Sequence, residues 1–213
     1  MSKVLEKIIS VRIMWYAKKK GLISSNQFVF QKGLGVIDPL LYFEHCASTT
    51  LSARNHLSVL SLDFEKASDR IGAHIVLLEL ERWCVGDEIY NFLLNRKIFV
   101  SVNNRNCNVP QPLSVTLFII AFNELSSLLS QYDTVEHLMY ADDVLIFSAL
   151  KDLTLMTETF TRILDDISNW SKTSGCKISA NKSSPFHICR KHKCTFPILS
   201  LSNTQIPHTN TII

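Results

Sequence analysis

The sequence of 213 residues contains no apolar run long enough to cross a lipid bilayer. Its most apolar stretch, from Val115 to Phe122, is far shorter than the roughly 20 residues that a membrane-spanning helix needs. No apolar segment follows the first residues, so no signal peptide is expected. The six cysteines include no C-x-x-C pair and are expected to be reduced thiols, mostly in the core. These absences predict an intracellular protein, nuclear or cytoplasmic, without a membrane span.

An excess of charge of one sign is also missing. The 22 basic and 19 acidic residues leave a net charge of +3, which is compatible with nucleic-acid binding but does not argue for it. Apolar residues make up 46% of the chain, which is enough to bury a core in one or two domains. Composition therefore leaves the function to be argued from motifs.

The pattern of apolar residues predicts a mixture of helices and strands. Helices are expected over residues 4–20, 39–54, 70–83, about 88–94, from 112 to about 128, and 152–170. Strands are expected over residues 57–64, 98–103, 138–140, 144–147, 177–179 and 186–188. This order predicts an α+β fold with helices packed on one face of an antiparallel sheet. Residues 191–213, rich in Ser, Thr, Asn and Pro, are expected to form a poorly ordered tail.

Three acidic residues stand at the ends of apolar strands. Asp63 closes the strand of residues 57–64, and Asp142 with Asp143 lies between two short strands. Neighbouring carboxylates repel each other, and a divalent cation such as Mg²⁺ would relieve that repulsion while binding substrate phosphates. The alternatives are ordinary turn chemistry for the Asp-Asp pair and simple closure of a strand for Asp63.

The residues around these acids resemble the palm motifs of reverse transcriptases from non-LTR (LINE-type, Jockey-like) retrotransposons. Residues 62–71 read L-D-F-E-K-A-S-D-R-I and residues 140–144 read Y-A-D-D-V, close to the family's L-D-F-x-K-A-F-D-x-I and Y-A-D-D. Three further segments resemble family motifs in the same order: residues 22–40, 108–118 and 170–183. Five ordered motifs between about residues 4 and 190 make this resemblance specific.

The resemblance implies the fingers and palm of a right-hand polymerase fold, with the thumb absent. Residues 1–56 would be a fingers-like N-terminal region, and residues 57–190 would be the palm, with a fingers part around 70–105. The implied activity is RNA-directed DNA polymerisation on an RNA template, with a DNA primer and deoxynucleoside triphosphates. No membrane and no protein partner are implied.

The resemblance also assigns roles to single residues. Asp63 and Asp142 would bind two Mg²⁺ ions, or Mn²⁺, with Asp143 beside them as a third catalytic acid. Ser68 stands where the family has an aromatic residue beneath the sugar of the incoming nucleotide. Gln111 falls in the segment that lies along template and nucleotide, and Lys182 falls near the triphosphate.

The sequence departs from the family pattern at several of these places. The Gly-Ser that follows Gln111 in the family is missing, so Gln111 meets Pro112 directly. Ser68 lacks the aromatic ring, and Val29 and Gln31 replace a glycine and an arginine of the fingers motif. These departures predict a decayed or truncated copy of impaired activity. The alternative is a non-catalytic remnant palm that at most binds nucleic acid.

Two other patterns admit more than one interpretation. His187, Cys189, His192 and Cys194 follow one another closely enough to suggest a zinc site, although a basic strand end with incidental thiols is the simpler interpretation. The three tryptophans lie on apolar helix faces and are expected in the core. His45, His56 and His74 show no partner pattern and receive no predicted role.

Overall fold

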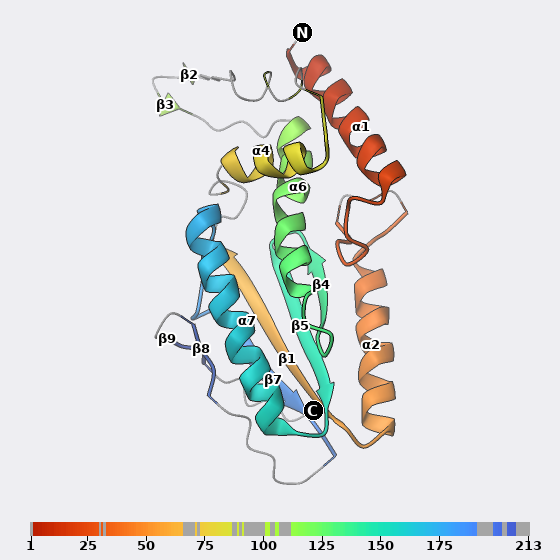
Figure 1. Cartoon of the computed structure of the whole chain (residues 1–213), viewed down its shortest axis with the longest axis vertical. Helices are drawn as coiled ribbons and strands as arrows, with labels where there is room; N and C mark the ends of the chain where they lie inside the picture. The colour runs from red at the N-terminus through yellow and green to blue at the C-terminus, as the bar shows by residue number, and fades with distance from the viewer. Residues whose placement is uncertain are drawn as a thin grey trace. The chain divides into compact units, whose positions relative to one another are not determined.

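The computed structural model describes residues 2–29, 31, 33–65, 71, 73–86, 89, 91, 101–102, 105–106, 112–190, 198–201 and 204–207. The chain divides into two compact units, each built from two separate stretches of sequence. The first unit is Met1–Ser24 with Ile71–Glu124, and the second is Ser25–Arg70 with Leu125–Ile213 (Figure 1). These units differ from the continuous ranges 1–56 and 57–190 that the sequence suggested.

The first unit contains the helices α1 (Ser2–Lys20) and α4 (Ala73–Arg82) and most of α6 (Pro112–Leu129). Its core contains apolar side chains from all three helices and from the turn after α4: Ile13, Ala17, Ile75, Val76, Leu80, Trp83, Leu113, Ile120 and Ala121. Two short strands, β2 (Ser101–Val102) and β3 (Arg105–Asn106), pair within the same unit and coincide with part of the strand and turn expected around residues 98–103. The described residues of the expected helix at 88–94, 89 and 91, are helical.

Helix α1 turns a different face to the core from the one that its apolar spacing suggested. Ile13 and Ala17, four residues apart, are buried. Trp15 is 62% exposed, and Val4, Ile8 and Val11 are exposed as well. The expectation of a core position is therefore wrong for Trp15, while Trp83 and Trp170 are buried as expected. Two apolar stripes run along α1. The stripe with Ile13 and Ala17 packs against α4 and α6, and the stripe with the larger Trp15 stays exposed.

The second unit is an antiparallel sheet of β1 (His56–Glu65), β4 (Glu136–Tyr140), β5 (Asp143–Leu150), β6 (Lys177–Ile178) and β7 (Ser184–Ile188). The strand order is β4-β5-β1-β6, and β7 also pairs with β1. Each strand coincides with one expected from the sequence. Strand β1 lies at the centre, and its apolar residues are buried on both faces of the sheet.

Helices cover both faces of this sheet because β1 is apolar on both sides. On one face, Phe43 of α2 (Ile37–Ser52) packs edge-on against Phe147, with 5.3 Å between ring centroids. On the other, Trp170 of α7 (Leu153–Ser174) packs edge-on against Phe64 at 6.1 Å, and Figure 1 shows α7 crossing the sheet. The expected α+β class with an antiparallel sheet is confirmed, and α2 adds a helix to the face opposite α7.

The described part of residues 191–213 is folded where the sequence suggested a poorly ordered tail. Strands β8 (Ser200–Leu201) and β9 (Thr204–Gln205) pair with each other, and β8 packs beside α7. Leu199, Leu201 and Ile206 are buried. These few apolar side chains hold the segment in place, although its composition is rich in Ser, Thr, Asn and Pro.

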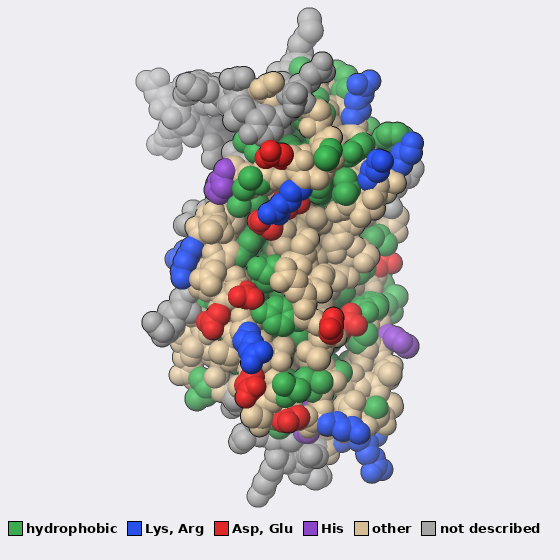
Figure 2. All heavy atoms as spheres, viewed as in Figure 1, with side chains coloured by type: hydrophobic (Ala, Val, Ile, Leu, Met, Phe, Trp, Pro, Cys, Tyr) green, Lys and Arg blue, Asp and Glu red, His purple; other side chains and the backbone are tan. Residues whose placement is uncertain are grey.

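The surface carries charge of both signs. Figure 2 shows Lys and Arg side chains along α1, and a mixture of acidic and basic side chains over α7. In the described part of the chain, no helix has the length and apolar character that crossing a membrane requires.

Candidate functional site

Three aspartates lie near one another where β1 and β4 end and β5 begins. In the antiparallel register of β1 and β5, Asp63 lies directly opposite Asp143. In the hairpin of β4 and β5, Tyr140 lies opposite the same Asp143, so Ala141 and Asp142 form the turn between them. The structure therefore brings together the three acids that the sequence singled out.

The turn that presents Asp142 contains an unusual backbone conformation. Ala141 has a φ of 56°, in the left-handed region that residues with a Cβ atom rarely adopt. Such a conformation costs about 1–2 kcal/mol, and the surrounding hairpin must hold it in place. Strained residues of this kind gather at functional sites, where they fix the direction of a neighbouring side chain.

A second turn holds the backbone of Asp63. The amide of Ser179 donates to the carbonyl oxygen of Asp63 at 2.9 Å, and the amide of Asp63 donates to Ser183 Oγ at 3.3 Å. Ser183 Oγ in turn donates to the carbonyl oxygen of Ser179 at 2.8 Å. Both serines are buried. The sequence predicts no role for either serine, because an uncharged residue inside a motif carries no signal of what it contacts.

Lys182, in the same turn, is the cation nearest to these acids among the described ion pairs. Its Nζ lies 3.8 Å from Asp63 Oδ1, and its side chain is 70% exposed. An ion pair this long and this exposed contributes little to stability, because water screens it. The motif resemblance places Lys182 near the incoming triphosphate, and that role stays a prediction.

Asp143 is affected by burial and by the charges of the other two acids. Burial, followed by the charges of Asp142 and Asp63, raises the pKa of Asp143 above its ordinary value. A carboxyl group surrounded by like charge is easier to protonate, and a bound cation would have the opposite effect. The site therefore carries a local excess of negative charge.

The carboxylates of Asp63 and Asp142 are of a kind that suits a hard divalent cation. Mg²⁺ binds a few carboxylate oxygens and completes its shell with water and phosphate oxygens. Within the described residues, Asp63, Asp142 and Asp143 do not bring one oxygen each within 4.8 Å of one another. The three acids therefore do not form a closed ligand set by themselves, and a Mg²⁺ ion held by two of the carboxylates would take the rest of its shell from water and phosphate oxygens.

The remaining predicted site residues, Ser68 and Gln111, lie outside the described residues. The fingers motif is described in part, and it lies along the outer edge of β4. The amide of Phe28 donates to the carbonyl oxygen of Met139 at 3.0 Å. The amide of Met139 donates to the carbonyl oxygen of Asn26 at 2.8 Å. Val29, which stands where the resembled fingers motif has a glycine, is buried.

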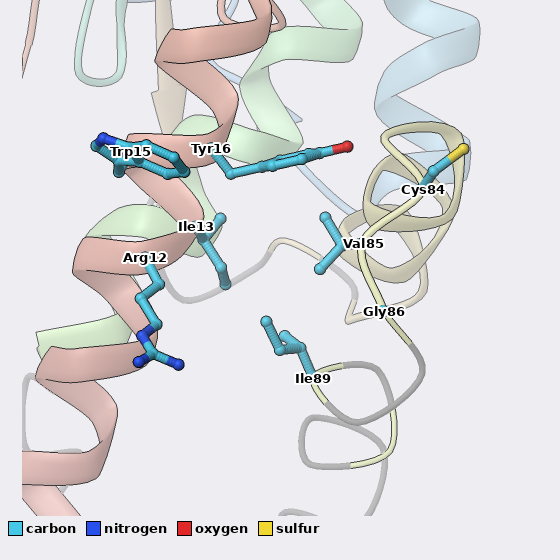
Figure 3. Close-up of a pocket in the computed structure, with 8 residues that line it drawn as sticks. All are labelled: Arg12, Ile13, Trp15, Tyr16, Cys84, Val85, Gly86 and Ile89. Carbon is cyan, nitrogen blue, oxygen red and sulfur yellow. The ribbon is translucent and has the colours of Figure 1, made fainter.

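The first unit contains a pocket of about 500 Å³ with a different character. Its lining comes from α1 and the segment after α4 and comprises Arg12, Ile13, Trp15, Tyr16, Cys84, Val85, Gly86 and Ile89. Figure 3 shows Ile13, Val85 and Ile89 facing one another across the hollow. The lining contains no acid, so the carboxylates of the second unit remain the candidate for phosphate chemistry.

The chain resembles known proteins in sequence and in fold. The chain matches the family model described as reverse transcriptase (RNA-dependent DNA polymerase) over residues 1–201. It is similar to the structure of apo telomerase from Candida tropicalis truncated from its C-terminal domain. The TM-score is 0.56 and the identity 14%, over 80% of this chain and 38% of that one.

A second similar structure is telomerase from Candida tropicalis in complex with a TWJ fragment of telomeric RNA. Here the TM-score is 0.54 and the identity 14%, over 84% of this chain and 33% of that one. At 14% identity the likeness establishes the fold alone. The chain spans 33% to 38% of the length of these two telomerase chains.

Proposed function

Because this chain belongs to the reverse transcriptase (RNA-dependent DNA polymerase) family, we propose that it forms the fingers and palm of a polymerase that copies RNA into DNA. Its partners would be an RNA template, a DNA primer and deoxynucleoside triphosphates. The observation that carries this proposal is the meeting of Asp63 with Asp143 across β1 and β5, beside Asp142 in the turn. The motif resemblance favours an origin in a non-LTR, LINE-type retrotransposon and a place of action in the nucleus or cytoplasm.

Asp63 and Asp142 would hold two Mg²⁺ ions, with Mn²⁺ as a substitute and Asp143 beside them. When bound, such ions activate the primer 3′-OH and neutralise charge on the leaving pyrophosphate. Lys182 is exposed and only loosely paired with Asp63, so its ammonium group could turn toward triphosphate oxygens. Ser68 would lie at the sugar of the incoming nucleotide and Gln111 along the template, as the motif resemblance implies.

The second candidate is a palm that has lost catalysis and at most binds nucleic acid. Helix α6 begins at Pro112, immediately after Gln111, where the family motif has Gly-Ser. Glycine allows a backbone to approach a substrate closely, whereas proline fixes φ and removes the amide donor. We therefore expect polymerisation, where it occurs, to be slower than in relatives that keep the Gly-Ser.

The test is primer extension on an RNA template in Mg²⁺ and in Mn²⁺, comparing the wild-type chain with Asp142→Asn. Loss of one metal-binding carboxylate should slow extension at least about 100-fold, because several kcal/mol of charge stabilisation disappear. Asp165→Asn is the matched control, since Asp165 is an exposed acid on α7, and it should extend primers as the wild type does.

The outcomes separate the two candidates. Extension that is lost in Asp142→Asn and kept in Asp165→Asn supports the polymerase. Extension that is the same in all three proteins would show that Asp142 has no part in it and would refute the assignment. Folded wild-type protein that binds an RNA–DNA duplex without extending it would support the non-catalytic palm.

A further inference from the structure

A cluster of two histidines and a cysteine lies at the far end of β1 from the carboxylates. His56 is the first residue of β1, His187 lies in β7, and Cys189 follows the last residue of β7. Strands rise about 3.4 Å per residue, so the seven residues from His56 to Asp63 separate this cluster from the acids by roughly 24 Å. It is therefore distinct from the proposed polymerase site.

The register of the sheet explains why these side chains meet. Ser58 pairs with His187 and Leu57 pairs with Ile188, so continuing the register sets His56 opposite Cys189. Side chains two residues apart on a strand share a face of the sheet. His56, Ser58, His187 and Cys189 consequently project from the same face, next to one another.

The distances suit a metal with nitrogen and sulfur ligands. One donor atom from each of His56, His187 and Cys189 lies within 4.8 Å of the other two. Nδ1 of His56 is 3.2 Å from Nε2 of His187. Two imidazole nitrogens bound about 2.1 Å from one tetrahedral zinc ion lie about 3.4 Å apart. The two histidines thus already have the spacing that a shared zinc ion requires.

The other nitrogen of His187 is positioned as it would be in a metal ligand. Its Nδ1 lies 2.8 Å from Oγ of Ser58, and Ser58 is fully buried. A metal-bound histidine usually donates its second ring N–H to a neighbouring oxygen, which fixes the ring and leaves the first nitrogen for the metal. Ser58 can accept that hydrogen bond, so it would act as a positioning residue.

We propose that His56, His187 and Cys189 bind one zinc ion. Nitrogen and thiolate ligands favour zinc over the hard Mg²⁺ ion. The ion would fasten the end of the edge strand β7 to the start of the central strand β1. Water would take the fourth position.

The test uses Co²⁺ as a spectroscopic probe in the metal-stripped chain. A cobalt ion bound by a thiolate shows a sulfur-to-metal charge-transfer band in the near ultraviolet, which oxygen ligands do not produce. We expect this band to saturate at one Co²⁺ per chain and to disappear when Zn²⁺ is added. Cys189→Ser should abolish the band, and His187→Gln should weaken binding. Ser58→Ala should weaken zinc binding about 10-fold to 100-fold.

Two controls isolate the site. Cys84→Ser removes an exposed thiol of the first unit and should leave the band unchanged, and Asp142→Asn should do the same because it alters only the carboxylates. Circular dichroism verifies that each variant is folded. Absence of the band in the wild type would overturn the proposal and leave a direct hydrogen bond between His56 and His187. A band that survives in Cys189→Ser would overturn it as well.

Discussion

His137 of β4 provides a sharp test of the packing beside the polymerase motif. It is buried and only three residues before Tyr140, which opens the turn that carries Asp142. Burial lowers the pKa of His137 to about 4. Ser126 Oγ lies 2.7 Å from its Nε2, and the amide nitrogen of Asn26 lies 3.2 Å from the same atom. An amide N–H group needs a ring nitrogen without a proton as its acceptor, so these contacts favour neutral imidazole.

The effect on stability follows from the difference between the folded and unfolded pKa. A lowered pKa in the folded state means that the unfolded chain takes up the proton first as the pH falls. Stability from His137 is therefore complete above about pH 6.5 and is lost as the pH falls toward 4. The loss amounts to about 2 kcal/mol between pH 7 and pH 5, and to about 3 kcal/mol once the pH is below 4.

Urea unfolding between pH 5 and pH 7 measures this loss, followed by the fluorescence of tryptophan. Trp170 packs on Phe64 in the same unit and reports on its unfolding. The wild type should lose about 2 kcal/mol more than His137→Gln over this range. His45→Gln, at an exposed position on α2, is the control and should keep the wild-type dependence. Equal pH dependence in the wild type and His137→Gln would refute the reasoning, as would an NMR titration of His137 with a midpoint above pH 6.

Two further predictions concern the proposed polymerase site. Asp143→Asn should raise the free energy of unfolding at pH 7 by less than about 1 kcal/mol, because it removes a partly buried charge and its repulsion by Asp142 and Asp63, which solvent already screens. The pKa of Asp143 is raised in the folded state, so this increase in the free energy of unfolding should shrink as the pH falls through that pKa. Urea titrations at several pH values measure it, and an increase that grows on acidification would contradict this account. Ser68→Phe should increase the preference for deoxynucleotides over ribonucleotides at least about tenfold in primer extension, because the ring would exclude a 2′-OH. Unchanged discrimination would show that Ser68 does not lie at the sugar.

Much of the fold could be predicted from the sequence because its signals are local. The apolar alternation of residues 57–64 predicted β1, and the strongly amphipathic stretch 152–170 predicted α7 to within a few residues at each end. The ends of α7 also carry local signals: Asp152 accepts hydrogen bonds from the first amides, and Gly175 adopts a φ of 79° at the other end. Asp63 and the Asp142–Asp143 pair stood out because acids are rare between apolar strands.

The parts that were missed depend on contacts between distant residues. The exposure of Trp15 could not be predicted, because two apolar stripes run along α1 and only the packing of α4 and α6 decides between them. The buried side chains of residues 199–206 were hidden in a polar composition. Discontinuous units such as Met1–Ser24 with Ile71–Glu124 are defined by contacts between segments that are distant in the sequence, and the order of helices and strands along the chain does not reveal such contacts.

By itself, the sequence determined which segments form helices and strands, and which acids stand at strand ends. Both properties arise from side-chain periodicity within a few residues. Only the tertiary structure decided that Ser183 supports Asp63 across 120 residues, and that His56 meets His187 across 131. Such neighbours are set by strand register and by which faces are buried, since a shift of one residue along a strand would turn each side chain to the opposite face.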